Sequence, residues 1–170
     1  MRSSNYEILV VDDDKGMRNL IVNLLSTPGH RCVTATNGKE ALETLSLKRF
    51  DAVVTDIVMP ELDGIALTRE LLKQYGDLPI MILTGHGEQY STATAISAGA
   101  REFIQKPFSA IEFIVRFHKM MREHEIVRAL IAQRRENFIS LPEKIKIEPR
   151  QEVSESFASE ITPLYPNPEA

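Results

Sequence analysis

The sequence predicts an α/β fold: a doubly wound, five-stranded parallel sheet with the strand order 2-1-3-4-5, followed by an extended C-terminal helix and a tail. Two observations predict it. Short apolar runs alternate with amphipathic segments from residue 6 to about residue 120, which is the pattern of repeated βα units. The amphipathic segments also have recognisable starts or ends, so that each can be assigned as a separate helix.

Five apolar runs have the length and composition of buried parallel strands. A lone cysteine, Cys32, lies in the second run. It cannot form an internal disulfide, and we interpret it as a strand residue and not as a reactive thiol. The five predicted strands are residues 8–11, 32–35, 52–54, 80–83 and 103–104.

Apolar residues at helical spacing predict the first and third helices. Pro28 and Gly29 end the first helix, and Asp63 can cap the start of the third. The apolar positions are Met17, Leu20, Ile21, Leu24 and Leu25 in the first helix, and Ile65, Leu67, Leu71 and Leu72 in the third.

The remaining helices are predicted mainly from their ends. Asn37 with Glu40 has the spacing of a capping box for the second helix, and Ser109 with Glu112 has it for the fifth. A shorter fourth helix is expected over residues 90–98, because Gly99 follows and can end it.

Beyond residue 120 the alternation of strands and helices stops. We therefore expect an α/β domain over residues 1–120, a helical extension over 121–138, and a Pro/Glu-rich tail over 139–170 that is disordered or bound to a partner. A heptad spacing indicates that the fifth helix runs long, either as a solvated helix or as a coiled coil. Its positions are Phe113, Phe117, Met120, Val127, Ile131 and Phe138, with His124 and Arg134 as polar interruptions. His124 has no metal-ligand spacing to another histidine or to the cysteine, and we expect it on the surface of the helix.

Composition limits the partners of the chain. A net charge of -4 gives no overall basic field, so direct nucleic-acid binding is not expected. No stretch approaches the roughly 18 apolar residues of a membrane span, and the N-terminus lacks an apolar leader. We expect a cytoplasmic protein that does not associate with membranes.

Acidic residues follow two of the predicted strands. Asp12, Asp13 and Asp14 come directly after the first strand, and Asp56 comes at the end of the third. If these strands are neighbours, the carboxylates converge at the carboxyl edge of the sheet, where open α/β sheets bind ligands. Clustered carboxylates repel one another unless a cation joins them, and oxygen ligands of this kind suit Mg²⁺.

Two further residues bring complementary chemistry to the same edge. Thr84 ends the fourth strand with a hydroxyl, and Lys106 follows the fifth with an ammonium group. A hydroxyl and a cation can hold phosphoryl oxygens, and a carboxylate can attack phosphorus once its negative charge is offset. Asp56 is the best placed residue for that attack.

In these features the sequence resembles the response-regulator receiver domains of two-component signalling, which have a flavodoxin-like fold. The resemblance covers about residues 6–120. It rests on Asp12-Asp13, on Asp56-Ile57-Val58-Met59-Pro60 followed by Asp63-Gly64, on Thr84-Gly85 and on Lys106-Pro107-Phe108.

The resemblance implies a phosphoprotein that is a signalling switch and not an enzyme. Asp56 would accept a phosphoryl group from a histidine kinase or a phosphotransfer protein. Asp12, Asp13 and Asp56 would bind Mg²⁺ together with the Val58 carbonyl, while Thr84 and Lys106 would contact the phosphoryl group.

The resemblance also implies a cis peptide bond between Lys106 and Pro107. Asp14 lies outside the acid pair of the family, and we expect it to be solvated or to cap a helix.

Signal output in the family couples the threonine to an aromatic residue on the fifth strand. Phe103 occupies that place, so the surface of the fourth helix, fifth strand and fifth helix would change on phosphorylation. Two variable positions bear on the lifetime of the phosphoryl group. Val58 supplies no polar side chain to position water, which implies slow hydrolysis, and His86 borders the site or binds water.

Several alternatives remain open. A phosphorylation-independent interaction module would keep the fold without the chemistry. An aspartyl-nucleophile phosphatase of the haloacid-dehalogenase type would have its nucleophile after the first strand, and it would leave the Met59-Pro60 pair, which follows the third strand, unexplained. No ATPase or helix-turn-helix pattern follows the domain, so output would come from a downstream protein partner, from onward phosphate transfer or from a homodimer formed through the long helix.

Overall fold

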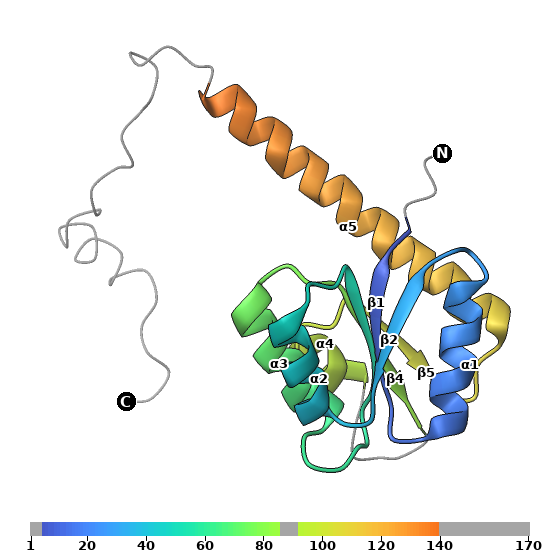
Figure 1. Ribbon diagram of the computed structural model, residues 1–170. Helices are drawn as coiled ribbons and strands as arrows, with labels where there is room; N and C mark the ends of the chain where they lie inside the picture. Colours follow the sequence, from blue (N-terminus) through green and yellow to red (C-terminus); the bar gives the residue numbers. More distant parts are fainter. Residues whose placement is uncertain (1–4, 86–91, 140–170) are drawn as a thin grey trace, which may run out of the picture. The chain divides into compact units, whose positions relative to one another are not determined.

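The computed structural model describes residues 5–85 and 92–139, except for the side chains of residues 92, 93 and 136–139. In these residues strands and helices alternate strictly along the chain (Figure 1). The strands are β1 (Glu7–Val11), β2 (Arg31–Ala35), β3 (Ala52–Asp56), β4 (Ile80–Thr84) and β5 (Glu102–Gln105). The helices are α1 (Lys15–Ser26), α2 (Gly38–Leu47), α3 (Gly64–Tyr75), α4 (Thr92–Ser97) and α5 (Ala110–Ile139).

The sheet has the predicted order, β2-β1-β3-β4-β5, and all four strand pairings are parallel. Val11 at the end of β1 pairs with Thr55 in β3, and Thr84 at the end of β4 pairs with Gln105 in β5. The register therefore brings the residues that follow these positions to one edge of the sheet.

Two hydrophobic layers enclose the sheet (Figure 1). On one face, side chains such as Leu9 and Val53 pack against α2, α3 and α4. On the other face, neighbouring residues such as Ile8 and Val54 pack against α1 and the first part of α5. Because both faces of the sheet are buried, the strand sequences are continuous apolar runs and do not alternate between apolar and polar residues.

The predicted helix starts are present, with one difference. Asp14 caps α1 by accepting the N–H of Met17 at 2.6 Å, so the capping alternative for Asp14 is confirmed. Asn37 caps α2 by accepting the N–H of Glu40 at 2.9 Å. The Glu40 carboxylate, however, accepts the N–H and hydroxyl of Thr36 and not the N–H of Asn37, so the predicted capping box closes one residue earlier.

The long fifth helix is confirmed, since α5 is continuous from Ala110 to Ile139. Phe113, Phe117 and Met120 are buried in the core, whereas Val127 and Ile131 in the same heptad frame are exposed. The chain divides into two units at Val127, so α5 begins in the first unit and ends in the second.

One expectation about α5 was wrong. His124 was predicted to lie on the surface of the helix, but it is only 7% exposed. Its Nδ1 lies 3.6 Å from the carboxylate of Asp77, which also pairs with Arg101. The Asp77 carboxylate thus approaches the buried imidazole from the loop before β4, a contact that the heptad pattern does not contain.

Some predictions lie outside the described residues. They include the start of the fourth helix at residue 90, His86, and the tail from residue 140 onward. Among the described helices, none is long and apolar enough to cross a lipid bilayer. The cellular location stays a prediction.

His30, in the turn before β2, is buried against α5. Its Nδ1 accepts the N–H of Tyr6 at 3.3 Å, so in this arrangement the imidazole is neutral and carries its proton on Nε2. Its ring lies 5.8 Å from that of Phe117 and 5.4 Å from that of His118, measured between centroids. Burial, together with the charge of His118, lowers the pKa of His30.

This lowered pKa predicts a loss of stability in acid. The unfolded chain takes up a proton on His30 as the pH falls below about 6.5, while the folded chain resists it. The free energy of unfolding should therefore fall from pH 7.5 to 5.5, and His30→Gln should show a smaller fall. Urea unfolding of both proteins at the two pH values measures this difference. Equal falls in the two proteins would show that His30 does not contribute.

Candidate functional site

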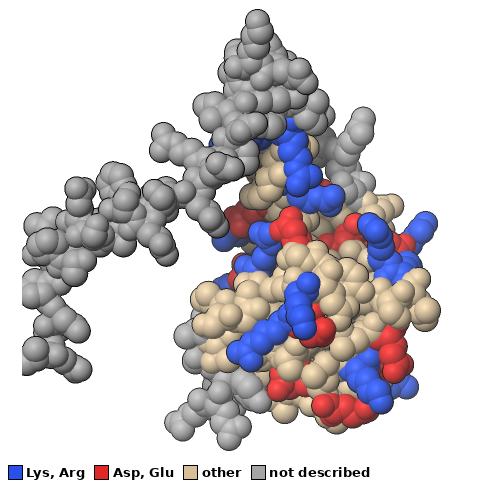
Figure 2. Space-filling model, turned by 90° about the vertical axis from the view of Figure 1, so that its left-hand side faces the viewer, with Lys and Arg blue, Asp and Glu red and all other residues tan. Residues whose placement is uncertain are grey.

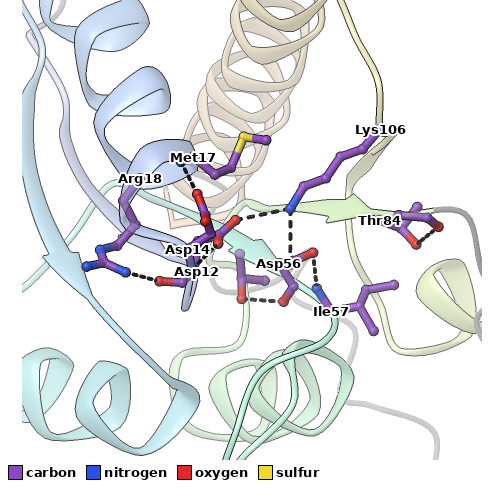
Figure 3. Close-up of polar contacts among 10 residues, drawn as sticks. Asp12, Asp14, Met17, Arg18, Asp56, Ile57, Thr84 and Lys106 are labelled. Carbon is purple, nitrogen blue, oxygen red and sulfur yellow. Dashed lines mark hydrogen bonds and ion pairs between the residues drawn. The ribbon is translucent and has the colours of Figure 1, made fainter.

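Asp12, Asp56 and Lys106 meet at the carboxyl edge of the sheet, and Thr84 lies farther along the same edge (Figure 3). Asp12 follows β1, Asp56 ends β3, Thr84 ends β4 and Lys106 follows β5. Each of these strands pairs with its neighbour in parallel, and so their carboxyl ends share one edge.

Three carboxylates form a cluster at this edge. Oxygen atoms of Asp12, Asp13 and Asp56 all lie within 4.8 Å of one another. Asp12 is 1% exposed and Asp56 is 9% exposed, whereas Asp13 faces solvent. The site is thus a partly buried cluster of acids that is exposed to solvent at Asp13.

Lys106 joins the two buried acids. Its Nζ lies 3.1 Å from Asp12 Oδ2 and 3.0 Å from Asp56 Oδ2 (Figure 3). Burial raises the pKa of Asp56, and the negative charge of Asp12 adds to the rise, while Lys106 opposes it. The lysine therefore offsets part of the cost of holding two carboxylates in a buried site.

The main chain around Asp56 is held closely. Asp56 Oδ1 accepts the N–H of Ile57 at 2.8 Å, and the N–H of Gly64 donates to the Ile57 carbonyl at 2.9 Å. A Cβ atom on Gly64 would lie 1.9 Å from the carbonyl oxygen of Asp56. Only glycine therefore allows the start of α3 to approach the end of β3 this closely.

The residues expected to transmit the signal have defined positions. The Thr84 hydroxyl donates to the Gly85 carbonyl at 3.2 Å, and Thr84 is buried. Phe103 is half-buried on β5, opposite Ile82. The Val58 side chain is 64% exposed beside the acids. The peptide bond between Lys106 and Pro107 is cis, as the resemblance implied.

Sequence reasoning missed one contact of the site. Arg18, in the first turn of α1, donates from Nη1 to the main-chain carbonyl of Asp12 at 2.6 Å (Figure 3). An arginine on a helix surface gives no signal of its own in a single sequence, because its partner is a main-chain atom in the preceding loop.

The donor set fits a divalent, oxygen-preferring cation. Asp12, Asp13 and Asp56 contribute three negative charges and Lys106 one positive charge, which leaves two negative charges among these four side chains. Carboxylate oxygens at an edge that is exposed on one side suit Mg²⁺, which keeps several waters when it binds.

The fold and site define a doubly wound α/β protein with an acidic cation site beside a lysine and a threonine. The chain belongs to the response regulator receiver family, because the sequence model of the response regulator receiver domain matches residues 8–118. Members of this family are components of two-component systems and are typically signalling switches rather than classical enzymes.

Curated relatives agree with this assignment. The chain is 38% identical over 115 residues to "Response regulator MprA" of Mycolicibacterium vanbaalenii, a match that covers 68% of this chain and 50% of that protein. It is 38% identical over 125 residues to "Probable transcriptional regulator ycf27" of Cyanophora paradoxa, with 74% of this chain and 52% of that protein covered. The chain spans about half the length of these relatives.

Solved structures show the same fold. NtrX from Brucella abortus has a TM-score of 0.72 and 33% identity, over 76% of this chain and 30% of that one. A response regulator receiver domain protein from Clostridium thermocellum has a TM-score of 0.66 and 30% identity, over 71% of this chain and 98% of that one. The second match shows that a whole receiver domain corresponds to the α/β part of this chain.

Proposed function

We propose that Asp56 accepts a phosphoryl group from the phosphohistidine of a sensor kinase or phosphotransfer protein, in a reaction that requires Mg²⁺. The observation that carries this proposal is the position of Asp56. Its carboxylate lies within 4.8 Å of those of Asp12 and Asp13 and 3.0 Å from the ammonium of Lys106. A carboxylate placed between an acidic cation site and a lysine is suited to attack an anionic phosphorus centre.

The transfer requires little from the protein beyond position and charge. A carboxylate oxygen of Asp56 forms a P–O bond as the P–N bond of the donor breaks, and the imidazole leaves with the bonding electrons. Lys106, already paired with Asp56, can then pair with the phosphoryl oxygens. Mg²⁺ held by Asp12, Asp13, Asp56 and the Val58 carbonyl would neutralise charge on the phosphoryl group.

Thr84 and Phe103 are proposed as the switch. The Thr84 hydroxyl donates to the Gly85 carbonyl and must leave it to reach a phosphoryl oxygen on Asp56. A cavity of about 350 Å³ beside Phe103, lined also by Gln105, Pro107, Glu112 and Arg116, lies on the surface of β5 and α5. Movement of Phe103 would reshape this cavity, and a downstream protein partner would recognise the changed α4, β5 and α5 surface.

The exposed Val58 side chain supports slow hydrolysis of the phosphoryl group, because it offers no group that could orient an attacking water. Decay of the phosphorylated protein after removal of the donor measures the lifetime. A half-life of seconds would contradict slow hydrolysis.

Two kinds of partner remain proposals. Figure 2 shows basic and acidic side chains intermingled on the face it presents, with no broad basic field among the described residues there. This favours a protein partner over direct nucleic-acid binding. The apolar side chains exposed on α5, such as Val127 and Ile131, favour a homodimer as a second possibility, which sedimentation of the protein would test.

Intact-mass measurement tests the proposed phosphorylation. The full chain is incubated with acetyl phosphate in Mg²⁺, or in EDTA at matched ionic strength. An adduct of about 80 Da, the mass of one phosphoryl group, is expected only with Mg²⁺, and hydroxylamine should remove it because acyl phosphates react with this nucleophile. The Mg²⁺ requirement follows from the excess negative charge of the site.

The other outcomes identify the alternatives. A folded protein that binds Mg²⁺ but forms no adduct would support a phosphorylation-independent interaction module. Repeated release of phosphate from added substrates would support an aspartyl-nucleophile phosphatase, which the family assignment disfavours.

A further inference from the structure

The two adjacent acids of the site differ in how firmly they are held. Asp12 accepts the N–H of Asp14 at Oδ1 and the ammonium of Lys106 at Oδ2, and its own N–H donates to the Ala35 carbonyl. Asp13 is exposed, and its side chain makes no hydrogen bond or ion pair within the described part of the chain. Something other than side-chain contacts must therefore direct Asp13 toward the other carboxylates.

Arg18 holds the peptide group that joins these acids. The Asp12 carbonyl belongs to the Asp12-Asp13 peptide, and Arg18 donates to it from Nη1 at 2.6 Å (Figure 3). The peptide group is planar, so a fixed carbonyl direction also fixes the direction of the following N–Cα bond. This contact therefore restrains the Asp13 Cα, from which the carboxylate extends, together with the bonds of Asp12 to Ala35 and Asp14.

Arg18 also lies near an acidic residue outside the site. Arg18 is half-buried, and it lies close enough to Glu40, in the first turn of α2, for its charge to act on that carboxylate. Hydrogen bonds from Thr36 are the main reason that the pKa of Glu40 is lowered, and the charge of Arg18 contributes to it. Arg18 therefore lies between the loop after β1, which it contacts, and the start of α2, on which its charge acts.

We propose that Arg18 is a positioning residue of the cation site, which orients the Asp12-Asp13 peptide so that the exposed Asp13 carboxylate faces Asp12 and Asp56. This role rests on the proposed Mg²⁺ site. It gives α1 a part in assembling the site beyond packing against the sheet.

A simple charge effect predicts the opposite result. Arg18 carries a positive charge near the acidic cluster, and Coulomb repulsion alone would make its removal strengthen the binding of a cation. Loss of a support for a metal ligand weakens binding instead, by about tenfold or more in other metal sites. The sign of the change in Mg²⁺ affinity therefore separates the two roles.

The test is calorimetric titration of Mg²⁺ into the full-length protein and its variants. Arg18→Met should raise the dissociation constant of Mg²⁺ by about tenfold, and Arg18→Lys, which keeps a charge and one donor, should raise it less. Lys15→Met is the matched control, since Lys15 is an exposed cation at the start of the same helix. That variant should bind Mg²⁺ as tightly as the wild type, or more tightly.

Phosphorylation provides a second readout. At saturating Mg²⁺, Arg18→Met should recover most of the wild-type rate of adduct formation, because the missing support affects only the assembly of the cation site. Equal or tighter Mg²⁺ binding by Arg18→Met, or no Mg²⁺ binding by the wild type, overturns the proposal. A wild type that binds Mg²⁺ but forms no adduct overturns the phosphoacceptor function alone, and the affinities of the variants still decide the role of Arg18.

Discussion

Replacing Asp56 by asparagine should abolish the phosphoryl adduct. An amide oxygen is a far weaker nucleophile than a carboxylate, and loss of a nucleophile lowers the rates of such reactions by at least about a thousandfold. The variant should still fold, because asparagine has nearly the same shape and can accept the N–H of Ile57 as Asp56 does at 2.8 Å. Intact mass after incubation with acetyl phosphate and Mg²⁺ measures the loss.

Asp51→Asn is the matched control for this substitution. Asp51 precedes the same strand at its opposite end, where its carboxylate accepts the N–H of Glu7 at 2.8 Å. It should form the adduct at the wild-type rate. An adduct that persists on Asp56→Asn would show that another residue is phosphorylated, and peptide mapping of the modified protein would then identify the acceptor.

Most of the fold could be predicted from local sequence. Continuous apolar runs such as residues 80–83 reflect strands buried on both faces, and Asp63 and Ser109 cap the helices that they were predicted to start. These signals are local, since each depends on residues only a few positions apart. The strand order was accessible because 2-1-3-4-5 is one of the common orders of doubly wound sheets and is the order of the family that the sequence resembles.

The site was predictable only in part. The acids and Lys106 follow strands whose carboxyl ends share an edge, so their convergence follows from the topology. The orientation of each group, however, does not follow from the topology. The bond from Arg18 to the Asp12 carbonyl and the turn of the Thr84 hydroxyl toward Gly85 depend on loop conformation, which residue spacing does not specify.

The error at His124 has the same origin. In the heptad frame of α5 the histidine is a polar interruption, which predicted a solvated position. Its neighbour Asp77 lies in the loop before β4, far away in the sequence, and the contact exists only after the sheet has brought the two together. Long-range pairing of a buried polar group therefore could not be read from the periodicity of the helix.

Replacing Gly64 by alanine should strongly destabilise the protein and impair phosphorylation. The added Cβ would lie 1.9 Å from the Asp56 carbonyl oxygen and 3.1 Å from the Ile57 Cα. Both are main-chain atoms, so no side chain can rotate to relieve the overlap. The end of β3 that carries Asp56 would have to move away from α3, at a cost of about 3 kcal/mol or more in the free energy of unfolding.

The direction of the stability change in Gly64→Ala distinguishes steric overlap with β3 from helix propensity. Gly64 begins α3, and helix propensity alone predicts that alanine stabilises the protein by up to about 1 kcal/mol. Gly85→Ala is the matched control, because a Cβ on Gly85 meets no atom within 4 Å, and its stability should stay within about 0.5 kcal/mol of the wild type. Urea unfolding and the yield of phosphoryl adduct are measured for both variants. If Gly64→Ala unfolds at the same urea concentration as Gly85→Ala, the approach of α3 to the end of β3 is not as close as the geometry requires, and Asp56 must be positioned by its hydrogen bonds alone.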